Sequence, residues 1–143
     1  MAEREVIVKH IEGLTFAGKG NSNTWVMMDG PEESDGSGGA AVRPKELLLL
    51  GLGGCTGSDV VSILKKKRVK LDNFEMNLTA DMTKEHPKVF TNIHIEYVIY
   101  GKDIKEKDVE RAIDLSVTKY CGVTAMLSKA MDITHSYRIE TGK

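Results

Sequence analysis

Residues 44–68, PKELLLLGLGGCTGSDVVSILKKKR, predict one long helix around which the rest of the chain is arranged. Pro44 suits the first helical position, where its missing N–H costs no hydrogen bond, and Glu46 places negative charge in the first turn. Basic residues from Lys65 to Arg68 close the other end, where the helix dipole favours cations. The leucines at positions 47 to 50 and 52 point in every direction around the axis. We therefore expect the first half of this helix to be enclosed on all sides.

Four glycines in the same helix indicate close packing: Gly51, Gly53, Gly54 and Gly57. Each costs about 0.5–1 kcal/mol relative to alanine in a helix interior, and close approach of another backbone is the usual compensation. We expect a second helix, or the twofold mate of this one, to pack on the glycine face with Cys55 in the contact. The pattern predicts an obligate homodimer, because a lone chain of 143 residues offers too little partner surface.

The composition excludes several classes of protein. A chain of 143 residues suits one domain, residues 1–143, because domains commonly hold about 100–150 residues. There are 20 basic and 21 acidic residues, which indicates neither a nucleic-acid surface nor an anionic-membrane surface. The N-terminus lacks the apolar core of a signal peptide, and the leucine-rich stretch falls short of the roughly 20 apolar residues that span a bilayer. We expect a cytoplasmic protein whose two cysteines are free or transiently paired.

The segments on either side of the helix predict an α+β fold. Three β-prone runs before it form a meander, and a mobile loop rich in glycine, serine and acids follows them: residues 5–11, 14–19, 24–28 and 29–43. After the helix we expect a long hairpin, an amphipathic helix that Cys121 and Gly122 interrupt, a second helical segment and a closing strand: residues 73–83, 89–100, 105–120, 123–131 and 133–139.

The two cysteines are the main candidates for chemistry. A thiol is a useful nucleophile only as the thiolate, which needs a nearby cation, a helix N-terminus or a base. Cys121 stands near the start of a helical segment, where free N–H groups favour negative charge. Cys55 lies in mid-helix and, by composition alone, is interpreted as a small buried hydrophobe. Asp59 is interpreted as part of a solvated helix face.

The other polar residues carry weaker signals. His94 is either a histidine whose hydrogen bonds are satisfied within the sheet or a residue that faces the site. The four histidines are scattered, and no CxxC or HxxxH motif occurs. We therefore expect no metal site and no cofactor.

The segment around Cys55, together with KYCGVTAML at residues 119–127, resembles the OsmC/Ohr family of organic hydroperoxide reductases, specifically its YhfA-like branch. The order of the elements also matches over nearly the whole chain. The resemblance implies an intertwined homodimer in which a β shell surrounds two long central helices that bear the cysteines. It also implies a role in oxidative or osmotic stress defence.

The resemblance assigns roles to both cysteines. Cys55 is the peroxidatic thiol, which attacks an organic hydroperoxide and becomes a sulfenic acid, and Cys121 resolves it as a disulfide. An external thiol reductant then restores both thiols. The residues alone favour Cys121 as the more acidic thiol, but a peroxidatic thiol also needs an apolar pocket, which Leu48 and Leu52 supply beside Cys55.

The activating residues of the family are replaced in this chain. Better-known members use an arginine after the first strand and a glutamate just behind the proline that opens the helix. Here Lys45 takes the glutamate position, and Glu46 lies one residue later, about 100° round the helix. No arginine occurs in residues 10–13. The candidates for thiolate activation are Arg43, Lys45 and Glu46.

A second hypothesis belongs to another class of function. The leucine-rich helix and the missing arginine also fit a dimeric module that binds a small ligand in a hydrophobic interface pocket and has no peroxidase activity. In that case the cysteines are incidental to the function.

Overall fold

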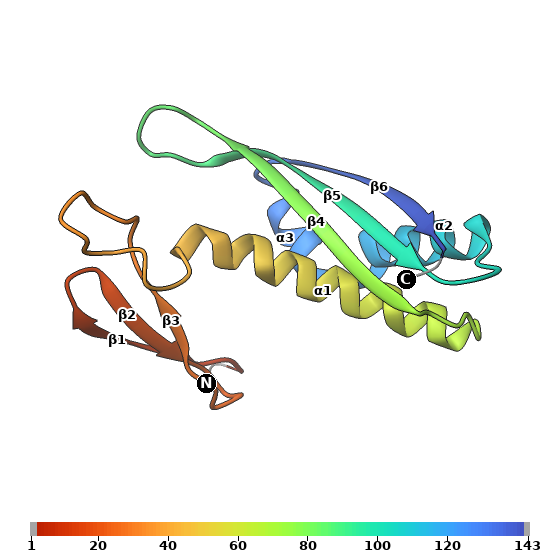
Figure 1. The fold of residues 1–143 in the computed structure, drawn as a ribbon, viewed down its shortest axis with the longest axis horizontal. Coiled ribbons are helices and arrows are strands. Elements are labelled where there is room, and N and C mark those ends of the chain that lie inside the picture. Colours follow the sequence, from red (N-terminus) through yellow and green to blue (C-terminus); the bar gives the residue numbers. More distant parts are fainter. Residues whose placement is uncertain (1–2, 142–143) are drawn as a thin grey trace. The chain divides into compact units, whose positions relative to one another are not determined.

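The computed structural model describes residues 3–141, and the chain divides into two compact units, residues 1–50 and 51–143. Figure 1 shows the predicted mixture of helices and sheets, so the α+β fold class is confirmed. Each described unit contains one three-stranded sheet. The expectation of a single domain stays a prediction.

The N-terminal unit contains the predicted meander. The strands β1 (Ile7–Glu12), β2 (Thr15–Lys19) and β3 (Val26–Met28) pair antiparallel in the order β1-β2-β3. Gly13 makes the turn after β1 with φ of 54°, a left-handed conformation that glycine adopts without strain.

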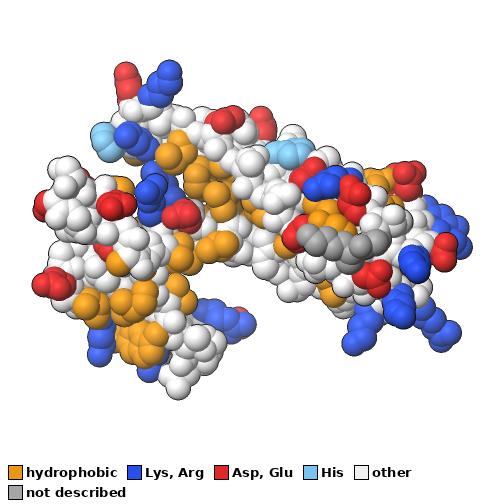
Figure 2. Space-filling view, viewed as in Figure 1, with side chains coloured by type: hydrophobic (Ala, Val, Ile, Leu, Met, Phe, Trp, Pro, Cys, Tyr) orange, Lys and Arg blue, Asp and Glu red, His pale blue; other side chains and the backbone are white. Residues whose placement is uncertain are grey.

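This small sheet has almost no core of its own. Ala17 is the only hydrophobic residue that is buried in the described part of the N-terminal unit. Figure 2 shows hydrophobic side chains gathered on the surface of this unit. The large side chains that are at least about a third exposed are Val6, Ile7, Val8, Ile11, Leu14, Phe16, Trp25, Val26 and Met27.

Hydrogen bonds tie together the segment that was predicted to be a mobile loop. The carboxylate of Asp29 is buried and accepts from the N–H of Gly30 at 2.8 Å and from that of Ala40 at 3.2 Å. Met28 also forms a bridge with Val42. The ends of the segment are therefore held close together, while its mobility stays a prediction.

The long helix α1 (Pro44–Lys66) begins where the sequence predicted and ends two residues earlier. At its start, Glu46 reaches back to accept from the backbone N–H of Arg43 at 3.1 Å, which is half of a capping box. At its end, Arg68 adopts φ of 62°, and the N–H of Val69 donates to the carbonyl of Leu64 at 3.0 Å. A left-handed residue cannot continue a helix, so the predicted boundary at Arg68 is wrong.

The C-terminal unit contains a sheet of mixed direction. Strands β4 (Asn73–Met82) and β5 (Phe90–Tyr100) form the predicted antiparallel hairpin. The closing strand β6 (Asp132–Glu140) pairs parallel to β5. Parallel strands need a crossover connection, which here consists of α2 (Glu106–Leu115), the π-helical turn η1 (Ser116–Tyr120) and α3 (Gly122–Leu127).

The core of this unit lies between the sheet and the helices. The alternation predicted for β5 holds from Asn92 to Tyr97, where every second residue is buried. Ile93, Ile95, Tyr97 and Ile99 are fully buried, but so is Val98, which was predicted for the opposite face. Three residues of α1 and three of α2 complete the core: Leu52, Val60, Leu64, Val109, Ala112 and Ile113.

A single chain does not enclose the first half of α1. Leu52 is fully buried, but Leu48 is 48% exposed and Leu50 is 59% exposed. The expected burial on all sides is therefore wrong for one chain. One chain does not provide enough surface to bury all the leucines near the start of this helix.

The glycines of α1 fall into two groups. A Cβ at Gly53 would lie 3.2 Å from Leu78, and one at Gly57 would lie 2.5 Å from Met76, so side chains of β4 approach these two glycines. The close neighbour is thus a strand and not the second helix that the sequence predicted. A Cβ at Gly51 or Gly54 would meet nothing within 4 Å in this chain.

Candidate functional site

The fold brings Cys55 and Cys121 together. Cys55 lies on α1 and is partly exposed, whereas Cys121 lies between η1 and α3 and is only 3% exposed. Both are free thiols, and Cys121 lies close enough to Cys55 to raise the pKa of the Cys55 thiol. The two residues that the sequence singled out for chemistry are therefore neighbours.

Backbone N–H groups at the N-terminus of α3 interact with both cysteine sulfurs. Cys121 is the N-cap residue, and its Sγ accepts from the N–H of Thr124 at 3.4 Å. The N–H of the preceding residue, Val123, donates to Cys55. The sequence predicted that this helix end favours a thiolate at Cys121 and that Cys55, in mid-helix, needs help from elsewhere in the fold. The N–H of Val123 gives such help to Cys55.

The surroundings of Cys55 oppose its ionisation overall. Burial is the largest cause and raises the pKa of the Cys55 thiol above its ordinary value. The hydrogen bond from Val123 lowers this pKa, while neighbouring negative charge on Cys121 and Asp59 raises it. In one chain Cys55 is therefore held mainly as the neutral thiol at neutral pH.

A buried polar network lies directly beside the thiols. The hydroxyl oxygen of Thr56 is 2.7 Å from the hydroxyl of Tyr97 and 2.7 Å from that of Ser116, and these three residues are fully buried. The Ser116 hydroxyl also donates to the carboxylate of Asp59 at 2.9 Å. Burial is the largest cause that raises the pKa of Tyr97, so its phenol stays protonated.

Sequence reasoning missed this network. Asp59 was interpreted as part of a solvated face, but it accepts a hydrogen bond from Ser116 of η1. The sequence did contain a pattern that indicates a buried position for Ser116. Val109, Ala112, Ile113 and Ser116 follow the spacing of one helix face, so a serine takes a position where an apolar residue is expected.

The candidate activating residues lie in the other unit. Arg43, Lys45 and Glu46 belong to residues 1–50, and Glu46 already caps the start of α1. Their part in activating the thiol stays a prediction. Of the two leucines predicted to line a substrate pocket, Leu48 is 48% exposed, whereas Leu52 is fully buried and has no free surface in this chain.

Other polar groups do not form a second reaction centre. Both ring nitrogens of His94 are bonded to hydroxyls of β6, at 2.7 Å to Thr134 and 2.9 Å to Ser136, so it is a satisfied sheet histidine. Across residues 3–141, no group of three or more His, Cys, Asp or Glu side chains is placed to hold a metal ion.

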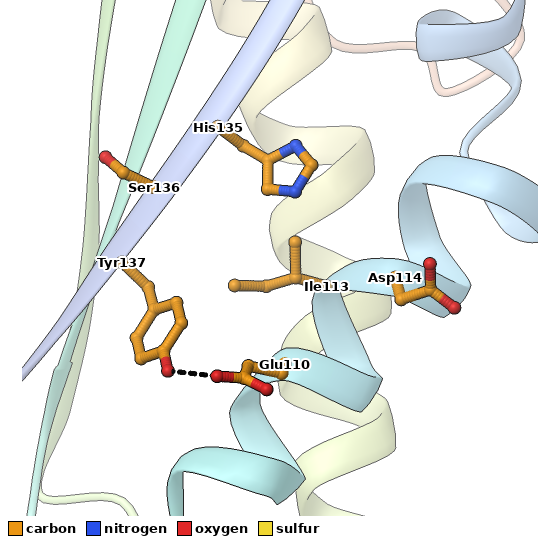
Figure 3. A pocket seen from close by; sticks show the side chains of 6 residues that line it. All are labelled: Glu110, Ile113, Asp114, His135, Ser136 and Tyr137. Atoms are coloured by element: carbon orange, nitrogen blue, oxygen red, sulfur yellow. Dashed lines mark hydrogen bonds between the residues drawn. The ribbon is translucent and has the colours of Figure 1, made fainter.

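An open pocket of about 400 Å³ lies between α2 and β6 (Figure 3). It is lined by Glu110, Ile113, Asp114, His135, Ser136 and Tyr137. The Tyr137 hydroxyl donates to Glu110 at 2.7 Å, and this bond is the main cause that raises the pKa of Tyr137 to about 12. The phenol of Tyr137 therefore stays protonated at neutral pH.

By length and composition, α1 is long and apolar enough to cross a membrane. The leucine-rich stretch was predicted to be too short to span a bilayer, whereas the whole helix meets the criterion. The core helix of a soluble protein passes the same test, so this property alone is weak evidence.

Comparisons with known proteins agree on one family. Residues 35–136 match the family model described as OsmC-like protein. The chain is 45% identical to Protein YhfA of Escherichia coli strain K12 over 132 residues, which cover 92% of this chain and 95% of that protein. A hypothetical protein from Aquifex aeolicus VF5 has a crystal structure with a TM-score of 0.85 at 32% identity, covering all of both chains. The organic hydroperoxide resistance protein OhrB of Bacillus subtilis matches with a TM-score of 0.65 at 13% identity, covering 96% of this chain and 98% of that one.

We expect the alkylation of Cys55 by iodoacetamide to be slow at neutral pH and to rise steeply above it. Only the thiolate reacts, so a raised pKa moves the whole titration to higher pH. The rate at Cys55, followed by peptide mass spectrometry, should rise about tenfold per pH unit and not level off below the ordinary thiol pKa of about 8.5. Replacement of Asp59 by Asn should move the curve to lower pH, because it removes a negative charge. A plateau below pH 8 in the wild-type protein would contradict the electrostatic argument.

Thr124→Val should stabilise the protein by about 1 kcal/mol, since removal of an unpaired buried hydroxyl recovers its desolvation cost. Thr124 is only 4% exposed, and its hydroxyl is the buried side-chain oxygen without a hydrogen-bond partner among the described residues. Urea unfolding at a fixed protein concentration measures the effect. The matched control is Thr118→Val, which removes a hydroxyl that donates to the carbonyl of Asp114 at 2.7 Å and should not stabilise. Destabilisation by Thr124→Val would show that the hydroxyl has a partner.

Proposed function

This chain belongs to the OsmC-like protein family, and from that premise we propose that it reduces organic hydroperoxides with Cys55 and Cys121. The observation that carries the proposal is the proximity of these two free thiols, which come from distant parts of the sequence and of which Cys121 raises the pKa of Cys55. The name of the Bacillus subtilis relative points the same way, although a likeness at 13% identity supports the fold alone.

The accessibility of the two thiols supports their order of reaction. Cys55 is partly exposed and can meet a hydroperoxide, whereas Cys121, at 3% exposed, is shielded from a substrate. Cys55 is therefore proposed as the peroxidatic thiol and Cys121 as the resolving thiol. The N–H of Val123, which donates to Cys55, stabilises negative charge on that sulfur.

The proposed reaction has two steps. The Cys55 thiolate attacks the terminal oxygen of the hydroperoxide, the O–O bond breaks, and the alcohol leaves after taking a proton. Cys55 is now a sulfenic acid. The Cys121 thiolate then attacks the Cys55 sulfur, a disulfide forms, and the hydroxyl leaves as water after taking a proton. An external thiol reductant then returns the disulfide to two thiols in two exchange steps, through a mixed disulfide, and is itself oxidised to a disulfide.

We also propose that the working form is a homodimer. An open groove of about 610 Å³ runs along α1 and β4, and Gly53, Gly54, Gly57, Val61, Phe74 and Met76 are among the residues that line it. Leu48, Leu50 and the hydrophobic face of the N-terminal sheet are also uncovered in one chain. A second copy provides the complementary apolar surface, as the two halves of a twofold interface do.

The remaining expectations belong to the same proposal. The fold is that of a soluble family, and we propose that the protein works in the cytoplasm in defence against oxidative or osmotic stress. Arg43, Lys45 and Glu46 remain the candidates that activate the Cys55 thiol, and Leu48 and Leu52 remain the candidates for the substrate pocket.

The raised pKa of Cys55 favours one alternative, a dimeric module that binds a small ligand and lacks peroxidase activity. Native mass spectrometry of the purified protein separates the two functions. A ligand that copurifies and survives Cys55→Ser would support binding. An empty protein that loses both thiols to cumene hydroperoxide would support the reductase.

Single cysteine variants test the order of reaction. After treatment with cumene hydroperoxide, Cys121→Ser should accumulate a sulfenic acid at Cys55 that dimedone labels, because the resolving thiol is absent. Cys55→Ser should show no label, since Cys121 is shielded from the substrate. Peptide mass spectrometry locates the label. Labelling of Cys121 in Cys55→Ser, with none at Cys55 in Cys121→Ser, would reverse the roles.

Gly54→Leu tests the dimer. A Cβ at Gly54 meets nothing within 4 Å in one chain, so this position faces the open groove that a partner is proposed to fill. We expect the wild-type protein to sediment as a dimer and Gly54→Leu to give insoluble or unfolded protein. The control Arg111→Leu adds a leucine at a side chain that is 59% exposed on α2 and should stay dimeric. A soluble, well-folded Gly54→Leu monomer would contradict the intertwined dimer.

A further inference from the structure

Ser116 is linked to both segments that carry a cysteine. Its hydroxyl contacts Thr56 at 2.7 Å and Asp59 at 2.9 Å, which are the residue after Cys55 and the residue one turn beyond it on α1. Its backbone carbonyl accepts from the N–H of Cys121 at 2.8 Å. One residue therefore connects the two thiol-bearing segments through its side chain on one side and its main chain on the other.

The hydrogen bonds of this junction have a fixed direction. A carboxylate only accepts, so the single proton of the Ser116 hydroxyl is committed to Asp59. The hydroxyl of Thr56 must then donate to Ser116, and that of Tyr97 must donate to Thr56. Asp59 thus orders a chain of three buried hydroxyls, and loss of its acceptor oxygen leaves that order undefined.

The bond from Ser116 to Cys121 belongs to a π-helical turn. Residues 116–120 form η1, and Cys121 donates to the carbonyl five residues before it. Such single turns insert one extra residue into a helix and are frequent at functional sites. Here the turn ends the helical run, and Cys121 with φ of −77° and ψ of 101° leaves it in an extended conformation and caps α3.

We propose that Asp59 and Ser116 form a clamp that holds the π-helical turn against α1 and thereby positions Cys121 for disulfide formation with Cys55. The clamp rests on the proposed reductase function and assigns positioning residues to its second step. In that step the Cys121 thiolate must approach the Cys55 sulfur in line with the S–O bond that breaks. The hydroxyl released takes a proton to become water, and the oxidant is the hydroperoxide already reduced in the first step.

The equilibrium constant of a protein disulfide against glutathione depends on the effective concentration of one thiol at the other, which close positioning raises by orders of magnitude. The clamp lies between α1 and the turn that precedes Cys121, so its loss displaces the attacking sulfur. The clamp side chains bond to each other and to Thr56, and the negative charge of Asp59 acts on Cys55 through space. Removal of the clamp should therefore affect the closing of the disulfide more than the first attack.

The test is the equilibrium of the Cys55–Cys121 disulfide in glutathione buffers of defined ratio, read by mass spectrometry after acid quenching. Ser116→Ala should lower the equilibrium constant for the disulfide by about 10- to 100-fold, which corresponds to about 30 mV for each tenfold. Ser116→Thr keeps the hydroxyl and should restore most of the loss. Asp59→Ala provides a second variant at a partly exposed position in case Ser116→Ala does not fold.

Two controls separate the clamp from other effects. Thr118→Val removes an exposed hydroxyl from the same π-helical turn, where it bonds only the carbonyl of Asp114, and should leave the disulfide constant within about twofold of the wild type. Asp59→Asn keeps an acceptor oxygen but removes the charge. It should lose much less disulfide stability than Asp59→Ala, while its Cys55 reacts faster with hydroperoxide.

The outcomes distinguish the clamp from the function on which it rests. The clamp would be overturned if Ser116→Ala and Asp59→Ala both kept the wild-type equilibrium constant for the disulfide. It would also be overturned if Thr118→Val lowered that constant as much as Ser116→Ala does. A wild-type protein that forms no disulfide in any glutathione ratio would also overturn it. A wild-type protein that forms the clamp-dependent disulfide but ignores hydroperoxides would count only against the reductase.

Discussion

A helix with apolar residues on every side needs more surface to cover it than one small sheet and two short helices provide. In this chain the inner face of β5 and the helix α2 cover one side of α1, where Leu52, Val60 and Leu64 are fully buried. Leu48 and Leu50 remain exposed, and Gly51 and Gly54 face open space. Full burial of a leucine side chain is worth roughly 1.5–3 kcal/mol, so these uncovered positions are a substantial driving force for association. The exposed hydrophobic face of the N-terminal sheet adds to it, because a three-stranded sheet with a single buried hydrophobic side chain has little stability of its own.

Much of this architecture followed from the sequence. Start and stop signals predicted α1, β-prone runs between turn residues predicted the meander, and a two-residue period predicted the hairpin. Local rules failed where the outcome depends on a distant partner. The end of α1 is fixed by the left-handed Arg68, a conformation that no residue pattern in KKKR signals. The parallel pairing of β6 with β5 depends on the path of the crossover, which periodicity does not specify.

The sequence named the two cysteines of the candidate site but not their surroundings. The resemblance of two segments to one family paired Cys55 with Cys121, and the fold brings them close enough for Cys121 to raise the pKa of Cys55, while their catalytic roles stay a prediction. The polar junction was missed for a physical reason. Thr56 and Asp59 are ordinary polar residues on a helix until β5 supplies Tyr97 and η1 supplies Ser116 opposite them. A buried polar group without a hydrogen-bond partner costs free energy, and any shift of α1 along the crossover would break the bonds among these four side chains. The hydrogen bonds therefore fix the register of α1 more strictly than apolar packing does.

Under the proposed function, the junction of Thr56, Asp59, Tyr97 and Ser116 favours the second chemical step and disfavours the first. The carboxylate of Asp59 orders the hydroxyls that position Cys121, but its charge raises the pKa of Cys55 and so reduces the thiolate available for the first attack. Burial of Cys55 acts in the same direction and has the larger effect. The N–H of Val123 offsets only part of this, since the pKa of Cys55 is raised overall. A fast first step therefore requires positive charge near Cys55 that residues 51–143 of one chain do not supply in the described contacts. Arg43 and Lys45, at the start of α1, are candidates with the required positive charge. They lie near the exposed leucines of the proposed dimer interface, so the formation of the dimer and the activation of Cys55 are proposed to involve the same part of the chain.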